Sequence, residues 1–233
     1  MKIKVMTFNT QHCLGYVSRE IDFNLMAEAI KSCAPDVVGL NEMRGEGSHE
    51  EYTAQVERLR ELTGMKYCYF AKAIEFSRGP YGNGLLSNIP ILKAESVPVP
   101  DPSPRGYDGY YETRCVLRAE LEGGITVLVS HFGLNPDEAE NAVKTVLAEL
   151  PAEKGIFMGD LNLQPEDPLL APLRARLQDT ADAMTEEKLS FPSDVPDRKI
   201  DYIFATPDWQ VTAADIPEIV ASDHRPHTAT VEL

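Results

Sequence analysis

The sequence is poor in cysteine and in long apolar runs, and each shortage excludes a class of protein. Its four cysteines, Cys13, Cys33, Cys68 and Cys115, are widely spaced and form no C-x-x-C pair, so they do not predict a zinc site. No segment is long enough to span a bilayer, and the first ten residues carry lysines but no apolar run of signal-peptide length. We therefore expect a cytoplasmic protein whose cysteines are ordinary reduced thiols.

Basic residues are also few relative to acidic ones. The chain has 22 Lys and Arg against 37 Asp and Glu, a net charge of −15. This charge repels a phosphate backbone unless the basic residues are concentrated on one face, which argues against avid, non-specific nucleic-acid binding. With 233 residues, 43% of them hydrophobic, the chain can bury a sizeable core. Because no linker divides it, we expect one domain over residues 1–233.

Apolar patterns predict helices and strands that alternate along much of the chain. Amphipathic spacing predicts helices at 23–33, 49–63 and 137–150, with a short helix near 169–177. Apolar runs predict strands at 2–8, 36–42, 67–74, 84–87, 92–97, 113–121, 125–131, 156–160, 199–204 and 228–233. The glycine-rich segment 79–84 predicts a loop, either close to a ligand or as a plain hairpin turn. Strand-helix-strand units of this kind are typical of an α/β fold.

The most informative stretch is 155–162, an apolar strand that ends in Asp160 and Asn162. If the backbone stays extended, these two side chains leave on the same face and can hold one substrate or one water. Alone the signal is weak, because many strands end in Gly-Asp merely to form a turn. Other predicted strands also end in polar residues. The complete set is Asn9, Glu42, His131, Asp160, Asn162, Asp201, Asp223 and His224.

This set is rich in oxygen atoms and contains histidine but no cysteine. Carboxylates with an asparagine suit a hard cation such as Mg²⁺, which prefers about six oxygen ligands. Histidines joined to carboxylates suit proton transfer or the stabilisation of a charged transition state. Metal-assisted phosphoester hydrolysis is the reaction that needs both.

Short motifs around these residues also occur in an order that is known from one superfamily. They are Thr7-Phe8-Asn9, Leu40-Asn41-Glu42, Tyr81-Gly82-Asn83-Gly84, Ser130-His131, Gly159-Asp160-Leu161-Asn162, Ile200-Asp201-Tyr202-Ile203 and Ser222-Asp223-His224-Arg225-Pro226. In these motifs the sequence resembles the endonuclease/exonuclease/phosphatase superfamily, typified by deoxyribonuclease I and exonuclease III. The resemblance implies a four-layer α-β-β-α sandwich, in which two mixed sheets pack face to face and the active site lies at one edge.

The resemblance further implies which residues hold a metal and act on water. Glu42 would be the principal ligand of Mg²⁺, or of Mn²⁺ as the alternative ion. Asp223 and Asn9 would lie close to the ion or to its waters. Asp160 would orient or deprotonate the attacking water, and Asn162 would hold the phosphate or that water.

Two histidines would bracket the phosphate by the same resemblance. His224, paired with Asp201, and His131 would neutralise charge that develops on the phosphate oxygens. Pairing with a carboxylate should raise the pKa of His224 and favour a charged ring. His12, His49 and His227 have no clear partner in the sequence, and we interpret them as ordinary surface or loop histidines.

Residues predicted to bind substrate rest on weaker matches. Tyr81 and Asn83 match a loop beside the phosphate, with a plain role as turn residues as the alternative. Arg114 falls where several relatives carry a phosphate-contacting arginine, with a surface salt bridge as the alternative. Asn41 stands where many relatives have glutamine. The tyrosine-rich loop 98–111 is either a substrate rim or a surface loop pinned by aromatic packing.

The first functional hypothesis is a metal-dependent phosphodiesterase or phosphatase that hydrolyses a small or terminal phosphoester by in-line attack of water. The basic residues are scattered and could hold one or two phosphates, which suits such a substrate better than a long duplex. A DNA or RNA endonuclease or exonuclease of the repair type is the alternative. A catalytically dead relative that binds a phospholigand or a partner protein is disfavoured because Glu42, Asp160 and His224 are all present. The oligomeric state is not predicted.

Overall fold

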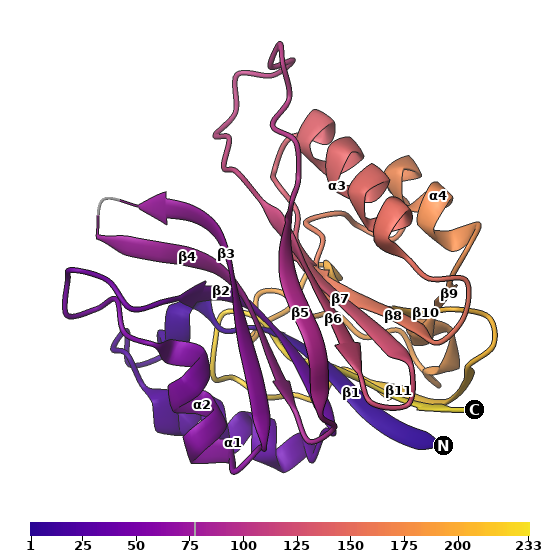
Figure 1. Cartoon of the computed structure of the whole chain (residues 1–233), viewed down its shortest axis with the longest axis horizontal. Coiled ribbons are helices and arrows are strands. Elements are labelled where there is room, and N and C mark those ends of the chain that lie inside the picture. The colour runs from indigo at the N-terminus through magenta and orange to yellow at the C-terminus, as the bar shows by residue number, and fades with distance from the viewer. Residues whose placement is uncertain (77) are drawn as a thin grey trace.

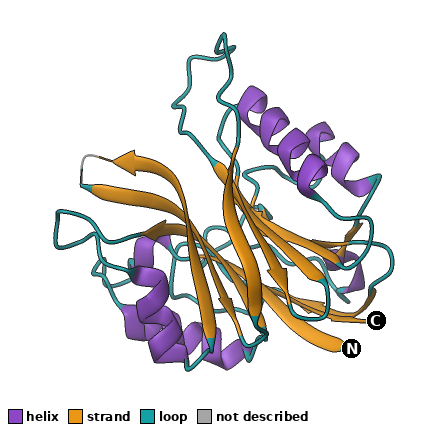
Figure 2. Ribbon diagram, in the orientation of Figure 1, coloured by secondary structure: helices purple, strands orange, loops and turns teal. Residues whose placement is uncertain are grey.

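Two six-stranded sheets pack face to face in the computed structural model, which describes residues 1–76 and 78–233 (Figures 1 and 2). The first sheet has the order β11-β12-β1-β2-β4-β3, with β1 (Lys2–Asn9), β2 (Val37–Arg44), β3 (Tyr67–Phe76), β4 (Gly79–Ser87), β11 (Gln210–Asp215) and β12 (His227–Glu232). The second has the order β5-β6-β7-β8-β10-β9, with β5 (Ile91–Pro98), β6 (Cys115–Leu121), β7 (Ile125–His131), β8 (Gly155–Asp160), β9 (Gln178–Asp179) and β10 (Asp201–Ala205).

Both sheets are mixed. In the first, β1 runs parallel to β2, and in the second β7 runs parallel to β8, while the other neighbouring strands are antiparallel. Helices cover the outer faces, with α1 (Phe23–Cys33) and α2 (Gln55–Thr63) on the first sheet, and α3 (Pro136–Glu149) and α4 (Ala171–Arg174) on the second. The four-layer sandwich expected from the sequence is therefore confirmed.

Alternation along each strand divides the core into three layers. On β1, Val5 is buried between the two sheets, whereas Met6 and Phe8 are buried under α1 and α2. The inner layer meets the second sheet through residues such as Val129 and Met158. Gly39 on β2 allows a close approach of the second sheet, because a Cβ atom there would lie 2.8 Å from the Met158 side chain. A larger residue at position 39 would push the two sheets apart.

Local signals explain where the helices begin and end. The Asp22 side chain accepts a hydrogen bond from the backbone of Leu25 and caps α1, which ends at Ala34 in the left-handed conformation. Helix α3 begins with Pro136 after Asn135, whose capping box includes Glu138. None of the helices formed by the described residues combines the length and apolar character needed to cross a membrane.

Three sequence-based expectations are corrected. Residues 79–84 are not a loop but part of β4, because Gly79 to Gly84 pair with β3, and Tyr81, Gly82 and Gly84 also pair with β2. Helix α2 begins at Gln55 rather than at residue 49, since the segment before it is bonded to the β3–β4 hairpin through Ser48 N and Arg78 O (2.9 Å). Strand β11 was not predicted, because this edge strand is defined by its pairing with β12 and carries little apolar alternation.

Asn41 on β2 joins the two sheets at one edge. Its amide nitrogen donates to Asn83 Oδ1 (2.8 Å) and to the backbone oxygen of Ser130 (3.1 Å), and its Oδ1 accepts from the backbone N–H of Asp160 (3.0 Å). Asn41 is fully buried. A residue without an amide here would leave backbone groups of β7 and β8 unsatisfied in the interior.

Asn41→Ala should lower the free energy of unfolding by about 3 kcal/mol, because each orphaned buried polar group costs roughly 1–3 kcal/mol. Urea denaturation followed by circular dichroism measures this change. Asn24→Ala is the matched control, since Asn24 is exposed on α1 and its replacement should change stability little. A loss below 1 kcal/mol in Asn41→Ala would show that the bridge is not a structural necessity.

Candidate active site

The strand register brings most of the predicted residues to one edge of the sandwich. In the first sheet the end of β1 at Asn9 lies beside the end of β2, where Glu42 is found. In the second sheet His131 on β7 pairs with Asp160 on β8, and Asp201 on β10 lies opposite Asp160. Ligands of α/β proteins bind where parallel strands end. Here the ends of two parallel pairs, one from each sheet, form a single site.

A β-bulge aims Glu42 into the site. Leu40 pairs with Gly84 but Met43 pairs with Gly82, so β2 has one extra residue relative to β4. Strict alternation from Leu40 would have placed Glu42 under the helices. The bulge, with Glu42 in the left-handed conformation (φ 62°), turns its side chain away from them. Such strain in a non-glycine residue is often found at functional sites.

Asn9 connects the two sheets through its side chain. Its amide nitrogen donates to Glu42 Oε1 and to Asp160 Oδ2, each at 3.0 Å, and its Oδ1 accepts from the backbone N–H of Gln11 (3.0 Å). Asn9 is fully buried. In this arrangement the nitrogen, rather than the oxygen, of Asn9 faces the two carboxylates, so Asn9 holds Glu42 and Asp160 in place.

His224 lies between two carboxylates. Its Nδ1 is 2.8 Å from Asp201 Oδ2, its Nε2 is 3.6 Å from Asp160 Oδ2, and the Phe191 ring packs against it with centroids 4.7 Å apart. Burial alone would lower the pKa of His224, but the charges of Asp201 and Asp160 outweigh burial and raise it to about 10. Burial raises the pKa of Asp160 to about 7, although His224 acts in the opposite direction.

His131, unlike His224, is neutral. Burial, followed by the positive charges of Arg114 and His224, holds the pKa of His131 well below its usual value, so the ring is neutral. Arg114 Nη1 lies 3.1 Å from His131 Nδ1 and 2.7 Å from Glu112 Oε1. Because a guanidinium can only donate, Nδ1 is the acceptor. The ring proton then lies on Nε2, 3.4 Å from Asp160 Oδ2.

Asp160 and Asn162 are brought together by a turn and not by an extended backbone. Strand β8 ends at Asp160, whose Oδ1 accepts from the backbone N–H of Asn162 (3.0 Å). Asn162 has a positive φ of 52° and donates to the backbone oxygen of Phe132 (3.1 Å), and its Nδ2 lies 3.2 Å from His131 Nε2. The expectation that alternation along a strand aligns the pair is therefore wrong, because the carboxylate closes a local turn.

The predicted substrate-contacting residues lie in different surroundings. Arg114 lies in the site, as described. Tyr81 on β4 is half-buried beside Glu42, and burial, followed by the Glu42 charge, raises the pKa of Tyr81. Asn83 is 2% exposed, and its amide is used for Asn41 and for the Cys115 backbone oxygen (3.1 Å). It lies between the sheets, beneath the site.

The surroundings of two further histidines differ from those predicted from the sequence. His227 is not on the surface but fully buried on β12, with its Nδ1 3.3 Å from the backbone oxygen of Asp201. The alternation of the last strand could have indicated this burial. His12 lies beside the site, with its Nδ1 4.0 Å from Glu42 Oε2. No local pattern indicates that contact, because His12 lies within a tight turn with positive φ at 11–13.

A cleft of about 500 Å³ lies at this edge of the sandwich, and we call it the phosphate cleft. Its walls are formed by Glu42, Tyr110, Arg114, His131, Leu134, Asp160, Asn162, Gln164, Phe191, Arg198, Ile200, Asp223 and His224. Asp223 is half-buried there, and its Oδ1 accepts from Ser222 Oγ (2.9 Å). The cleft thus contains both acidic and basic groups in a confined volume.

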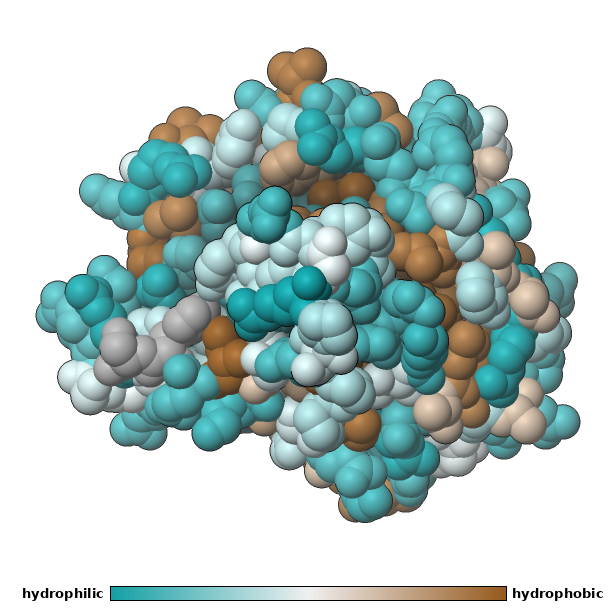
Figure 3. Space-filling view, turned by 90° about the horizontal axis from the view of Figure 1, so that it is seen from above, coloured by the Kyte–Doolittle hydropathy of each residue, from teal (hydrophilic) through white to brown (hydrophobic). Residues whose placement is uncertain are grey.

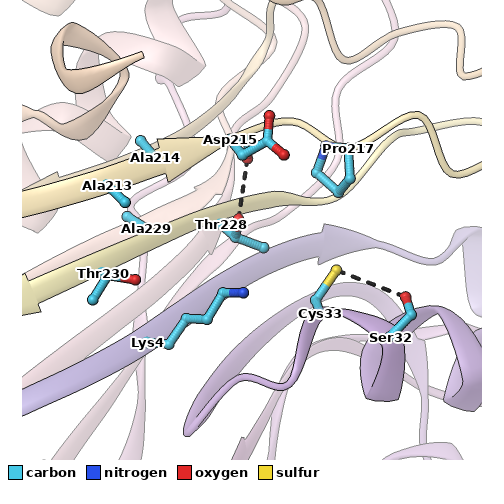
Figure 4. Close-up of a pocket in the computed structure, with 10 residues that line it drawn as sticks. All are labelled: Lys4, Ser32, Cys33, Ala213, Ala214, Asp215, Pro217, Thr228, Ala229 and Thr230. Carbon is cyan, nitrogen blue, oxygen red and sulfur yellow. Dashed lines mark hydrogen bonds between the residues drawn. The ribbon is translucent and has the colours of Figure 1, made fainter. Parts of the chain in front are cut away.

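Another cavity, of about 230 Å³, is lined by residues of β1, β11, β12 and the end of α1 (Figure 4). Its wall includes Lys4, Cys33 and Asp215, together with alanines and threonines of β11 and β12. Lys4 precedes Asn9 by five residues on β1, which corresponds to about 17 Å along the strand. Its lining residues include no histidine and one carboxylate, so they do not provide the chemistry found in the phosphate cleft.

The donor set fits a hard divalent cation. Glu42, Asp160 and Asp223 all line the phosphate cleft, and carboxylates gathered in one place favour a bound cation. Ligand atoms of Asp160, Asp201 and His224 also lie within 4.8 Å of one another. That trio is already joined by the short contact between His224 and Asp201, and a charged imidazole does not bind metal. Glu42 and Asp223 are therefore the better candidates.

The charge of His224 can be measured directly in the metal-free protein. We expect its ring resonance to titrate near pH 10, and Asp201→Asn to lower this pKa, because burial is then opposed by Asp160 without the Asp201 charge. The Asp201 pair should stabilise the fold fully below pH 6.5 and lose this effect as pH rises through 10. Two-dimensional NMR of the five histidines is the measurement. A resonance of His224 that titrates near 6.5 would contradict the assignment.

Comparison with known proteins agrees with this architecture. The sequence profile of the endonuclease/exonuclease/phosphatase family matches residues 6–224. No curated protein matches the sequence significantly. Among solved structures, an endonuclease/exonuclease/phosphatase from Beutenbergia cavernae superposes with a TM-score of 0.78 at 23% identity, covering 100% of this chain and 72% of that one.

Two similar structures have more specific names. A mannosyl-6-phosphatase from Bacteroides thetaiotaomicron has a TM-score of 0.78 at 14% identity, covering 99% of this chain and 100% of the other. Truncated TDP2 from Caenorhabditis elegans has a TM-score of 0.65 at 17% identity, covering 100% and 98%. At these identities the structures establish the shared fold, and the profile match over almost the whole sequence establishes the family. The chain therefore belongs to the endonuclease/exonuclease/phosphatase family.

Proposed function

We propose that this protein is a divalent-metal-dependent phosphoesterase that hydrolyses a small or terminal phosphoester by in-line attack of water. One observation carries the proposal. The Asp160 carboxylate is shared by three groups: Asn9 Nδ2 at 3.0 Å, His131 Nε2 at 3.4 Å and His224 Nε2 at 3.6 Å. Asp160 as a base, His131 as a neutral donor and His224 as a cation thus face one small volume. This is the arrangement needed to activate water beside a phosphate.

Glu42 and Asp223 would hold the metal, with Asn9 fixing the Glu42 carboxylate. Mg²⁺ is the preferred ion and Mn²⁺ the alternative, because the candidate ligands are oxygen atoms. Such an ion, when bound, polarises a phosphoryl oxygen and offsets its negative charge. The need for a cation is also electrostatic, because the chain has a net charge of −15 and must bind an anionic substrate.

Asp160 would accept a proton from the attacking water. Its pKa of about 7 lies close to neutral pH, where a general base is both available and strong enough to act. His224, held charged by Asp201, would face the oxygens on which negative charge increases. His131 would donate a hydrogen bond from Nε2 while remaining neutral, and Asn162 would hold the phosphate or the water.

A small or terminal substrate is supported by the size and charge of the site. The phosphate cleft is about 500 Å³, and Arg114 and Arg198 are the arginines in its wall. A small phosphate ester fits these dimensions. The mannosyl-6-phosphatase of similar fold carries a sugar phosphate in its name, in keeping with such a substrate. We also propose that the protein acts in the cytoplasm.

Hydrolysis of bis-p-nitrophenyl phosphate and of p-nitrophenyl phosphate tests the proposal. We expect turnover of one of them with Mg²⁺ or Mn²⁺, its loss with EDTA, and its loss in Asp160→Ala, which controls for contaminating enzymes. Preference for the diester indicates a phosphodiesterase, and preference for the monoester indicates a phosphatase. A folded protein that hydrolyses only oligonucleotides would support the repair nuclease instead, and one that hydrolyses no ester would support a binding protein.

A further inference from the structure

A second cavity of about 500 Å³ adjoins the phosphate cleft, and we call it the side cavity. The two share Leu134 and Asn162 in their walls, so a group attached to a phosphate beside Asn162 can extend into the side cavity. Its other lining residues come from the loop before β6, the loop leading into α3, the start of α3 and the segment around Asp167. Of the residues that line the side cavity, only Asn162 takes part in the proposed hydrolysis.

The tyrosine-rich loop between β5 and β6 forms one wall and is fixed to α3. This loop projects beyond the sheets beside α3 (Figure 1). Gly106 N–H donates to Asp137 Oδ2 (2.9 Å), the Tyr111 hydroxyl donates to the same carboxylate (2.8 Å), and Asn135 Nδ2 donates to the backbone oxygen of Tyr110 (2.8 Å). These bonds hold Tyr107 at the side cavity and Tyr110 at the phosphate cleft. The loop therefore forms an ordered wall that the side cavity and the phosphate cleft share.

The lining of the side cavity differs from that of the phosphate cleft in charge. Its charged residues are Asp137, Glu140 and Asp167, and the residues lining it include no lysine, arginine or histidine. Tyr107 is 50% exposed and Leu134 is 64% exposed, so they offer apolar surface to a ligand. The face toward which the loop projects is mostly hydrophilic, with apolar side chains in small patches (Figure 3).

We propose that the side cavity binds the organic group of the substrate and selects groups without negative charge. This inference rests on the proposed phosphoesterase activity and specifies its substrate class, a phosphoester of a small ring-bearing alcohol that is neutral or cationic. Apolar faces of Tyr107 and Leu134 would contact the ring. A neighbouring carboxylate or phosphate on the substrate would be repelled by the acidic wall. A nucleic-acid strand, which carries a phosphate at every step, is disfavoured for the same reason.

A charge series of substrates tests the inference. Glucosamine 1-phosphate, glucose 1-phosphate and glucuronic acid 1-phosphate carry a cationic, a neutral and an anionic group on the same kind of pyranose ring. If only the diester is hydrolysed in the general assay, p-nitrophenyl diesters of the same three compounds replace them. We expect kcat/KM to fall in the order given, with about a tenfold or larger difference between the first and the last.

Glu140→Lys provides the matched variant. Glu140 lies on α3 at the side cavity and pairs with Lys144 (2.7 Å). The substitution should reduce the preference for the cationic over the anionic ester about tenfold. The control is Glu28→Lys, which breaks the equivalent pair with Lys31 on α1, changes the net charge equally, and should leave the preference unchanged.

Several results would overturn the inference without affecting the proposed function. They are equal kcat/KM for the three esters, preference for the anionic ester, faster hydrolysis of an oligonucleotide than of the sugar esters, or the same shift in Glu28→Lys as in Glu140→Lys. By contrast, absence of metal-dependent hydrolysis of every p-nitrophenyl ester would contradict the phosphoesterase activity itself. The two failures are therefore distinguishable.

Discussion

Glu42→Ala should abolish metal-dependent hydrolysis, with turnover falling by at least about a thousandfold. Glu42 is aimed at the phosphate cleft by the β-bulge in β2 and is held by Asn9 at 3.0 Å. Without this carboxylate the cleft loses its principal candidate metal ligand, and a bound metal typically contributes several kcal/mol to transition-state stabilisation. Titrating turnover against Mg²⁺ and measuring Mg²⁺ binding by calorimetry would separate lost binding from lost chemistry.

Two variants make the result specific. Glu42→Gln keeps the shape of the side chain and an oxygen that can accept from Asn9, but removes the charge, so it should also lose most of its metal affinity. Glu46→Ala removes an exposed glutamate four residues further on and should retain wild-type activity. If Glu42→Ala kept its Mg²⁺-dependent turnover, the assignment of Glu42 as principal ligand would be wrong.

His224→Ala should lower kcat by about a thousandfold while changing KM by no more than about threefold. The ring is 5% exposed at its side chain and is held charged between Asp201 and Asp160. Its interaction with the phosphate strengthens as negative charge develops, so its loss affects the transition state more than the bound substrate. Initial-rate kinetics on the p-nitrophenyl ester that the protein hydrolyses would measure both constants.

The companion variants test whether charge, rather than shape, is responsible. Asp201→Asn keeps a partner for Nδ1 but removes the negative charge, and should lower kcat less than His224→Ala does. His49→Ala is the control, because His49 is a half-buried histidine outside the phosphate cleft, paired with Glu51 and Arg78. A His224→Ala protein that raised only KM would show that His224 binds substrate without contributing to the chemical step.

Much of the fold could be predicted because its signals are local. The strands that became β7 and β8 each have an apolar centre, at 127–129 and 156–158, and end at His131 and Asp160. Helix α1 was predicted with its observed bounds, 23–33, since its apolar stripe is continuous and Asp22 caps it. Where the signal was weak, as in the edge strand β11, the element was missed, because its residues show little apolar alternation and its pairing with β12 defines it.

The candidate site was predictable only as a set of residues. Polar residues at strand ends can be found from periodicity, because a strand that enters the core must change composition where it leaves. The distances between these residues and their charges cannot be found from periodicity, because they depend on which strands become neighbours. The contact between Asn9 and Asp160 joins residues 151 positions apart, and the neutral state of His131 depends on its burial and on Arg114.

The sequence by itself determined the α/β class, the order of most elements, the acidic overall charge and the set of polar residues from which the site is built. The tertiary structure decided how those residues act. It created the bulge that aims Glu42, closed the turn between Asp160 and Asn162, and converted the predicted loop at 79–84 into strand β4. It also made His224 positively charged and His131 neutral. The physical reason is that periodicity reports on burial along one segment, whereas bulges, long-range hydrogen bonds and pKa values arise from contacts between segments.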